Sequence, residues 1–329
     1  MPEASAAGRA QGQPGAGAGT AQRAMLPVPG GGFLMGSDHH YPEERPAHRM
    51  QVGAFSMDAT AVTNAAFAAF VAATGYVTVA ERPIDPAQYP GARPELLTPG
   101  SLVFHMTEGP VDTSDIRNWW RWVPGACWRF PEGPGSDLTG RADHPVVQVA
   151  YEDAAAFADW ARAALPTEAE WEFAARGGLE AAEFAWGDAL TPEGRHMANI
   201  WQGPFPWRNF AADGFAGTCP VRSFPPNGYG LFEMCGNVWE WTADWYAARH
   251  QADAPAPSCC GAEAAHAARE ASMDPRQPAI RIPRKVVKGG SFLCAPSYCR
   301  RYRPAARHAQ MVDSGSSHIG FRCIRRATA

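Results

Sequence analysis

Two cysteines could do chemistry together, because Cys294 and Cys299 lie five positions apart in a basic segment that runs from Lys288 to Arg303. A loop of this length can bring both sulfurs together, and nearby cations favour the thiolate over the thiol. Two thiolates suit a soft, monovalent copper ion. Zinc is the rival metal, but it normally takes four ligands, and the paired Cys-x-x-Cys spacing is missing. The spacing alone leaves copper or redox chemistry open beside a structural pair or inert thiols.

Other candidate residues favour plainer interpretations. A histidine pair before a glutamate pair could suggest a metal, but we expect a solvated loop at His39, His40, Glu43 and Glu44. Three neighbouring tryptophans could stack on a ligand, but large aromatic side chains more often form core, which we expect for Trp119, Trp120 and Trp122. The isolated cysteines are predicted to be small buried residues: Cys127, Cys219, Cys235 and Cys323.

The composition is that of a folded globular chain. The 329 residues carry a formal net charge of -4 and are 46% hydrophobic, which argues against a disordered, membrane-spanning or nucleic-acid-binding protein. The 33 glycines, 30 prolines and 12 tryptophans predict long irregular loops folded over an aromatic core. The longest apolar run, Ala65–Ala73, is too short to cross a bilayer.

The N-terminal segment and the cysteine usage predict the cellular setting. Residues 1–24 are almost entirely small or polar, so we expect a flexible tail there and a single domain over residues 25–326. The tail lacks the charged start, apolar stretch and cleavage site of a secretory signal. Eight cysteines without such a signal fit a reducing compartment. We therefore expect a cytoplasmic monomer with no membrane or nucleic-acid partner.

Local patterns predict the elements that must position the thiols. An alternating segment around Phe33 and Met35 is typical of a short strand. A helix is predicted over Asn64–Thr74, with Thr63 as its N-cap and Gly75 as its stop. This helix should pack its aromatic face against a sheet.

A second helical region is interrupted by proline. Helical spacing runs through residues 152–176 until Pro166 breaks it, and Thr167 and Glu170 then form a capping-box pattern. We expect two helices joined by a very short connection, which serve as scaffold. The segment Tyr246–Pro283 lacks steady periodicity, so we expect an irregular surface excursion there.

Six short motifs agree in order with one known family. Over residues 25–326 the chain resembles the formylglycine-generating enzyme, or sulfatase-modifying factor, family, through the motifs Pro166–Glu172, Ala198–Gly203, Phe224–Leu231, Gly236–Trp241, Gly289–Ser291 and Gly320–Arg322. A wider superfamily shares several of these. The discriminating element is the Cys294 and Cys299 pair before Arg301–Arg307, with Cys259 and Cys260 upstream. The resemblance implies one irregular, mixed α/β domain of the C-type-lectin-like class, with little regular secondary structure.

The same resemblance implies an oxidase. Cys294 and Cys299 would hold Cu(I) as a bis-thiolate, the substrate cysteine would join as a third sulfur ligand, and dioxygen would react there to leave an aldehyde, formylglycine. The substrate implied is an unfolded sulfatase carrying Cys-x-Pro-x-Arg, which requires an open groove beside the copper. By resemblance, Ser291, Tyr298 and Trp239 line the site.

Calcium is the second cofactor that the resemblance implies, since hard cations take oxygen ligands from irregular loops. One site would use Asn199, Ile200, Asp213 and Phe215. A second site would use Glu233, Gly236, Val238 and Glu240, where position 233 carries a longer acid than the amide of some relatives. Without the resemblance, such residues are more often found simply in turns.

Two rival functions stay open on the sequence. An iron-dependent sulfoxide synthase of the ergothioneine type shares the domain but needs a histidine triad and usually an added helical domain, and neither is visible. A non-catalytic C-type-lectin-like module uses the same fold to display a ligand surface, and the thiol pair argues against it. The resemblance also implies disulfide-forming cysteines in secretory-pathway members, and this chain has Ala158 and Ala175 at the helical positions concerned, which supports a cytoplasmic setting.

Overall fold

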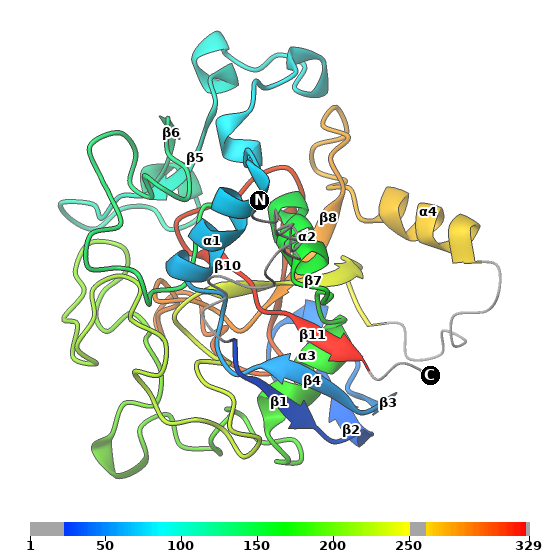
Figure 1. Ribbon diagram of the computed structural model, residues 1–329. Helices are drawn as coiled ribbons and strands as arrows, with labels where there is room; N and C mark the ends of the chain where they lie inside the picture. Colours follow the sequence, from blue (N-terminus) through cyan, green and yellow to red (C-terminus); the bar gives the residue numbers. More distant parts are fainter. Residues whose placement is uncertain (1–22, 251–260, 327–329) are drawn as a thin grey trace, which may run out of the picture.

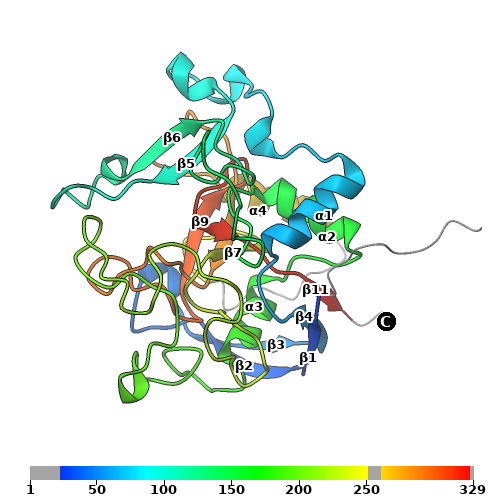
Figure 2. The same ribbon diagram turned by 60° about the vertical axis from the view of Figure 1, so that its left-hand side comes forward.

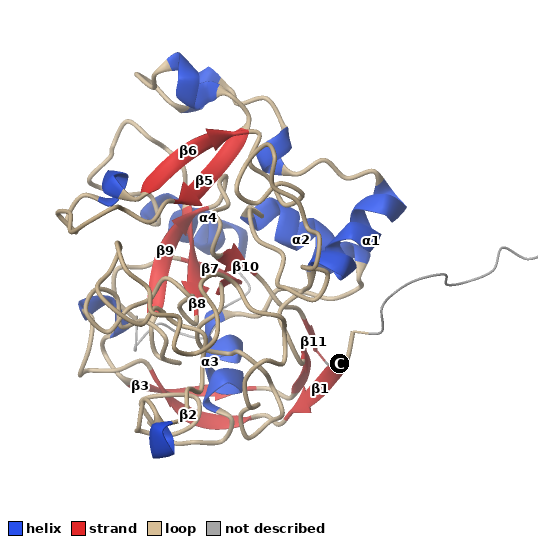
Figure 3. Ribbon diagram, turned by 90° about the vertical axis from the view of Figure 1, so that its left-hand side faces the viewer, coloured by secondary structure: helices blue, strands red, loops and turns tan. Residues whose placement is uncertain are grey.

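The computed structural model describes residues 23–250 and 261–326, and loops make up most of that part of the chain (Figure 3). The short strands pair in four small sheets (Figure 1), which confirms the predicted mixed α/β class with sparse regular structure. The strands are β1 Met25–Val28, β2 Gly31–Met35, β3 His48–Val52, β4 Phe55–Asp58, β5 Gly100–Phe104, β6 Trp120–Pro124, β7 Trp239–Trp245, β8 Arg284–Lys288, β9 Arg307–Met311, β10 Ile319–Gly320 and β11 Ile324–Arg326. The helices are α1 Asn64–Thr74, α2 Tyr151–Trp160, α3 Glu168–Arg176 and α4 Gly261–Ala271.

The largest sheet carries the cysteine pair. Its strand order is β10-β7-β8-β9, with β10 parallel to β7 and the other neighbours antiparallel. Figure 2 shows this sheet between the β5–β6 pair and the strands of the N-terminal region. The loop between β8 and β9 contains both Cys294 and Cys299, so paired strands fix both of its ends.

The predicted helix boundaries are confirmed. The Thr63 hydroxyl accepts a hydrogen bond from the N–H of Ala66 at 3.2 Å, and Gly75 ends α1 with a φ of +68°. Thr167 caps α3, and the carboxylate of Glu170 accepts the N–H of Thr167 at 2.7 Å, which completes the predicted capping box. These contacts satisfy backbone donors that the first turn of a helix leaves unpaired.

The very short connection predicted within the second helix pair is wrong, because residues 161–167 separate α2 from α3. Helix α3 lies between the largest sheet and the β2–β3 pair, whereas α2 packs against α1 (Figures 2 and 3). Between α2 and α3 the backbone is extended at Ala164, which exchanges hydrogen bonds of 2.8 and 2.9 Å with Ile324 of β11. This pairing separates the two helices and leaves α3 free to cover the sheet that carries the cysteines.

The aromatic core lies mainly where α1 and α2 meet. Phe67, Phe70 and Phe157 are almost fully buried, and their ring centroids lie 5.4 to 6.0 Å apart. Burying each such side chain stabilises the fold by about 1.5–3 kcal/mol. Because Cys294 belongs to the same cluster of buried residues, the core positions the first cysteine directly.

The segment Tyr246–Pro283 is more regular than expected. It contains α4, which projects from the body of the molecule in Figure 1. Alanine has the highest intrinsic helix propensity, so an alanine-rich segment can form a helix without an apolar stripe. The hydroxyl of Ser272 then accepts the N–H of Arg284 at 3.0 Å and ties the excursion to β8.

Cys259 and Cys260, which form part of the family resemblance, lie outside the described residues, as do residues 1–22 of the predicted tail. Across residues 23–250 and 261–326, none of the helices combines the length and the apolar character that spanning a membrane requires.

Candidate active site

The loop between β8 and β9, residues 289–306 and called here the thiol loop, begins with two glycines that the fold requires. Gly289 and Gly290 have φ values of +93° and +71°, in the region that side chains disfavour. A Cβ atom on Gly290 would lie only 2.8 Å from the carbonyl oxygen of Arg301. Glycine therefore lets the first part of the thiol loop lie directly against its second part.

This turn brings the two sulfurs together. The N–H of Cys299 donates to the carbonyl of Ala295, and the N–H of Cys294 donates to the carbonyl of Ser291, each at 2.9 Å. The two Sγ atoms lie 3.4 Å apart, which is well beyond a disulfide bond of about 2.05 Å. Cys294 is 2% exposed and Cys299 is partly exposed. The pair is thus two free thiols that can share one proton or one ligand.

The two thiols differ in acidity. A hydrogen bond from Cys294 and the charge of Arg301 lower the pKa of Cys299 to about 7. Burial raises the pKa of Cys294, and its role as donor to Cys299 adds to the effect. The Arg301 Nη1 atom lies 3.8 Å from the Cys299 sulfur. As the pH rises through about 7, the pair therefore goes from two protons towards one, with Cys299 as the thiolate and Cys294 as its donor.

A distant acidic turn holds the arginines of the thiol loop. The Arg303 guanidinium donates to both carboxylate oxygens of Glu44, at 2.8 and 2.5 Å, and both side chains are at most 1% exposed. Arg301 pairs with Glu43 and lies 3.7 Å from the centre of the Tyr41 ring. The expectation of a solvated loop is wrong for both glutamates, because their partners come from a segment more than 250 positions away.

Three further predicted residues lie at the thiol loop. Ser291 is fully buried, and its N–H donates to the sulfur of Cys294 at 3.4 Å. Tyr298 is 37% exposed and stacks on Phe205 with 4.5 Å between ring centroids. Trp239 is buried in the same cluster that contains Cys294 and packs against Cys299. Ser291 therefore contacts the pair directly, Tyr298 faces solvent beside it, and Trp239 belongs to the packing around it.

His318 is a neighbour of the site that the sequence did not single out. Its Nδ1 atom lies 3.0 Å from the hydroxyl oxygen of Ser291. The only sequence signal was its place two residues before the Gly320 motif. The ring of Trp120 packs edge-on against it, with 4.8 Å between centroids. Of the three tryptophans expected in the core, Trp119 is buried, whereas Trp120 and Trp122 are partly exposed.

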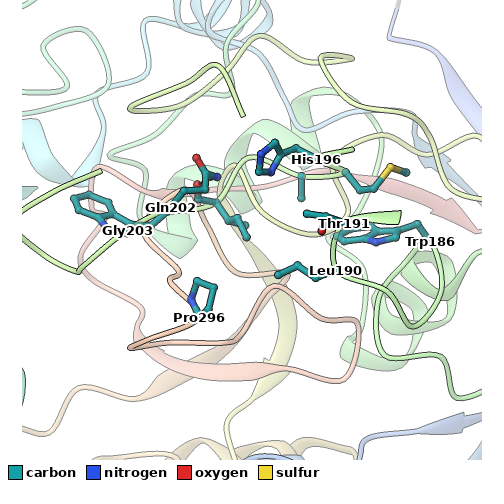
Figure 4. A pocket seen from close by; sticks show the side chains of 11 residues that line it. Trp186, Leu190, Thr191, His196, Gln202, Gly203 and Pro296 are labelled. Carbon is teal, nitrogen blue, oxygen red and sulfur yellow. Dashed lines mark hydrogen bonds between the residues drawn. The ribbon is translucent and has the colours of Figure 1, made fainter. Parts of the chain in front are cut away.

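An apolar cavity of about 240 Å³ adjoins the thiol loop (Figure 4). Pro296 of the loop forms one wall, and Trp186 and Leu190 form another. Trp201 also lines the cavity, and its backbone N–H donates to the carbonyl of Cys294 at 3.1 Å. The cavity and the cysteine pair therefore share one piece of backbone.

Comparisons with known proteins find relatives over nearly the whole chain. The model of the sulfatase-modifying factor enzyme 1-like domain matches residues 11–327. The chain belongs to the sulfatase-modifying factor family. A relative from Mycobacterium tuberculosis named formylglycine-generating enzyme is 54% identical, over 91% of this chain and 97% of its own. One of the same name from Thermomonospora curvata is 47% identical, over 92% and 93%. These matches confirm the predicted family and the prediction of a formylglycine-generating enzyme.

The similar proteins also include relatives that are named as inactive. A protein from Mus musculus named inactive C-alpha-formylglycine-generating enzyme 2 is 37% identical, over 92% of this chain and 86% of its own. Among solved structures, PvdO from Pseudomonas aeruginosa has a TM-score of 0.59 at 24% identity, over 92% and 94% of the two chains. That likeness supports the fold alone.

The first predicted calcium set offers oxygen atoms in one place. The Oδ1 atom of Asn199 is buried without a donor. The hydrogen-bond donors to the Asp213 carboxylate are neutral amides. They are the N–H groups of Ile200 and Phe215, both at 3.0 Å, and the Gln202 side-chain amide at 2.6 Å. The same Gln202 amide also contacts the carbonyl of Ile200. An unpaired buried oxygen beside an uncompensated carboxylate fits a hard cation such as calcium.

The second predicted calcium set does not fit a cation in the same way. Both carboxylate oxygens of Glu233 accept backbone N–H groups, at 3.0 and 3.1 Å. The Glu240 carboxylate accepts two hydrogen bonds from Arg322, at 2.7 and 2.8 Å, and one from Trp171 at 2.7 Å. The guanidinium thus already supplies the positive charge that this carboxylate needs.

The remaining cysteines and histidines form no further centre in the described chain. Burial raises the pKa of each isolated thiol, to about 12 for Cys219, Cys235 and Cys323, which confirms them as small buried residues. Across residues 23–250 and 261–326, no three His, Cys, Asp or Glu side chains are grouped to hold a metal, the His39 and His40 segment included. Within the described residues, the thiol pair therefore has no third His, Cys, Asp or Glu side chain grouped with it.

Proposed function

We propose that this chain oxidises the cysteine of a Cys-x-Pro-x-Arg segment in an unfolded sulfatase to formylglycine, with copper held by Cys294 and Cys299. The observation that carries the proposal is the 3.4 Å approach of two unlinked sulfurs, one of them with a pKa near neutrality. Relatives named formylglycine-generating enzyme support the reaction class. The copper, the substrate motif and the roles below are proposals built on that geometry.

The chain's own groups prepare the pair for a soft metal ion. Arg301 favours the thiolate of Cys299, so only the Cys294 proton must be lost when a metal binds. Bound Cu(I) would supply a soft centre with room for the substrate thiolate and for reaction with dioxygen. The Ser291 N–H steadies the Cys294 sulfur, and buried Trp239 keeps water from that side. These residues orient the sulfurs before any substrate arrives.

Electron counting defines what else the reaction consumes. Converting a CH2–SH group to an aldehyde with release of hydrogen sulfide removes two electrons. Reducing dioxygen to two oxygen atoms at the level of water takes four electrons: one oxygen enters the aldehyde and the other leaves as water. Two electrons must therefore come from a second reductant, and two molecules of an external thiol, oxidised to a disulfide, supply them.

The substrate polypeptide needs an exposed surface beside the thiols. Tyr298 offers an exposed aromatic face next to Cys299, and the cavity lined by Pro296 offers apolar space on another side. An extended peptide could lay its side chains against these features while its cysteine approaches the sulfur pair. On the sequence arguments above, we further propose a cytoplasmic monomer.

The proposed function predicts copper-dependent loss of a peptide thiol. Incubation with a Cys-x-Pro-x-Arg peptide, Cu(I), dithiothreitol and air is expected to give a product whose mass, by mass spectrometry, matches the aldehyde. A peptide with serine in place of cysteine is the matched control and should not react. If the cysteine peptide returns unchanged with copper present, or reacts equally well in its absence, the copper oxidase proposal is wrong.

The rival functions have less support in the structure. An iron site built from a histidine triad needs three grouped ligands, and the described residues group none. A non-catalytic ligand-display module has no use for two free sulfurs held 3.4 Å apart in a basic loop. The copper oxidase is therefore the function that the geometry favours.

We also propose that Asn199, Ile200, Asp213 and Phe215 hold one calcium ion. Calcium is then expected to raise the unfolding free energy, by about 2.7 kcal/mol when free calcium is 100 times its Kd. Substitution Asp213→Asn should remove this increase in calorimetry, because it deletes the carboxylate charge. Substitution Glu233→Gln, in the set that does not fit, should leave the increase intact. Equal losses in both variants would contradict the assignment.

A further inference from the structure

A histidine and a serine form a hydrogen-bonded pair beside the sulfurs. Ser291 follows the two glycines that begin the thiol loop, and His318 precedes β10, which pairs with β7 in the largest sheet. The Ser291 hydroxyl oxygen lies 3.0 Å from the Nδ1 atom of His318. The roles proposed above for copper, substrate and the thiols make no use of this contact.

The hydrogen bonds of Ser291 make the direction of its hydroxyl group depend on His318. The Ser291 oxygen accepts the N–H of Leu293 at 3.2 Å, which occupies one of its two lone pairs. If Nδ1 of His318 is bare, the hydroxyl hydrogen goes to the histidine, and the oxygen keeps one lone pair for the site. If Nδ1 carries a proton, both lone pairs are filled, and the hydroxyl hydrogen becomes free to donate to the site. The histidine thus decides whether Ser291 accepts or donates beside Cys294.

The histidine ring is held in place by its surroundings. The ring packs edge-on against Trp120, and the His318 carbonyl accepts the backbone N–H of Trp239 at 2.9 Å. Burial lowers the pKa of His318 below its ordinary value, and the charge of His308 acts in the same direction. A neutral, clamped imidazole is a suitable partner for fixing one hydroxyl orientation.

We propose that His318 is a positioning residue for the thiol site, acting through the hydroxyl of Ser291. This inference rests on the proposed function, since it assigns His318 to that same site. Removing the ring leaves the Ser291 hydroxyl free to rotate. Partners of this kind, which orient a residue at a reactive centre, typically contribute about 10–100-fold to activity or metal affinity.

The test compares four variants and one control variant on the Cys-x-Pro-x-Arg peptide. We expect His318→Leu to lower kcat/KM by about 10–100-fold, and His318→Asn, whose amide can reach the Nδ1 position, to recover most of that loss. Ser291→Ala combined with His318→Leu should be no slower than Ser291→Ala alone, because the histidine acts only through the serine. His266→Leu, on exposed α4, is the matched control and should keep wild-type turnover.

A second measurement does not depend on turnover. In ¹⁵N spectra of the imidazole nitrogens, Ser291→Ala should shift the Nδ1 signal of His318, which is assigned by its absence in His318→Asn. An unchanged Nδ1 signal, an additive double variant, or an asparagine variant no better than leucine would overturn the inference. If Ser291→Ala shifts the Nδ1 signal of His318 but the wild-type protein never converts the peptide, the proposed function is overturned instead.

Discussion

Replacing Cys294 or Cys299 by alanine is expected to abolish aldehyde formation, by about 1,000-fold or more, as removal of one member of a catalytic set usually does. Either change leaves a single sulfur where the proposed copper site needs two, and the two sulfurs lie 3.4 Å apart in the wild type. The two single variants and the double variant should be equally slow, since neither sulfur binds the metal adequately alone. Peptide turnover measured by mass spectrometry, under saturating Cu(I), checks this.

The control for that experiment is a cysteine of another kind. Cys127 is 4% exposed, and burial raises its pKa, so Cys127→Ala should retain peptide turnover close to that of the wild type. Circular dichroism spectra and unfolding midpoints should show that all variants fold. Substantial turnover by folded Cys294→Ala or Cys299→Ala would remove the chemical basis of the proposed function.

Substitution of Glu44 by glutamine is expected to lower the free energy of unfolding by about 3–5 kcal/mol. The change keeps the volume of the side chain but leaves the Arg303 guanidinium, 1% exposed, without its charged partner. Removing one member of a buried ion pair costs this much because the remaining charge stays out of water. Urea unfolding monitored by tryptophan fluorescence measures the loss.

An exposed ion pair provides the comparison. Arg49 and Glu180 lie 2.7 Å apart, but their side chains are 72% and 54% exposed. Glu180→Gln should therefore change the unfolding free energy by no more than about 1 kcal/mol. If Glu44→Gln proves equally mild, the buried pair does not anchor the thiol loop as the structure indicates. The second test of that anchoring is peptide turnover, which should fall in Glu44→Gln and stay unchanged in Glu180→Gln.

Signals confined to a few neighbouring residues were enough to predict several elements. Thr63 and Gly75 marked the ends of α1, and Thr167 with Glu170 marked the start of α3, because caps depend on hydrogen bonds within one turn of the chain. The same holds for the cysteines themselves. Five positions of separation in a loop made their approach possible, and the glycines at its start made the turn possible.

Contacts between distant segments could not be predicted from local sequence patterns. Glu44 and Arg303 are 259 positions apart, so no local pattern showed that this one glutamate of a charged segment is buried. The histidine at position 318 became a candidate only when β10 paired with β7 and brought it to Ser291. The sequence showed only that the second calcium set departs from some relatives at position 233, whereas the structure shows that Arg322 pairs with the carboxylate of Glu240.

The sequence by itself therefore determined the family, the pair of cysteines at the candidate site and the local helix boundaries, since each of these depends on residue type and short spacing. Only the tertiary structure decided which charges are paired out of water, which thiol carries the lower pKa, and which side chains surround the reactive pair. The physical reason is that burial and pairing depend on the packing of segments far apart in the chain, and no local pattern encodes them.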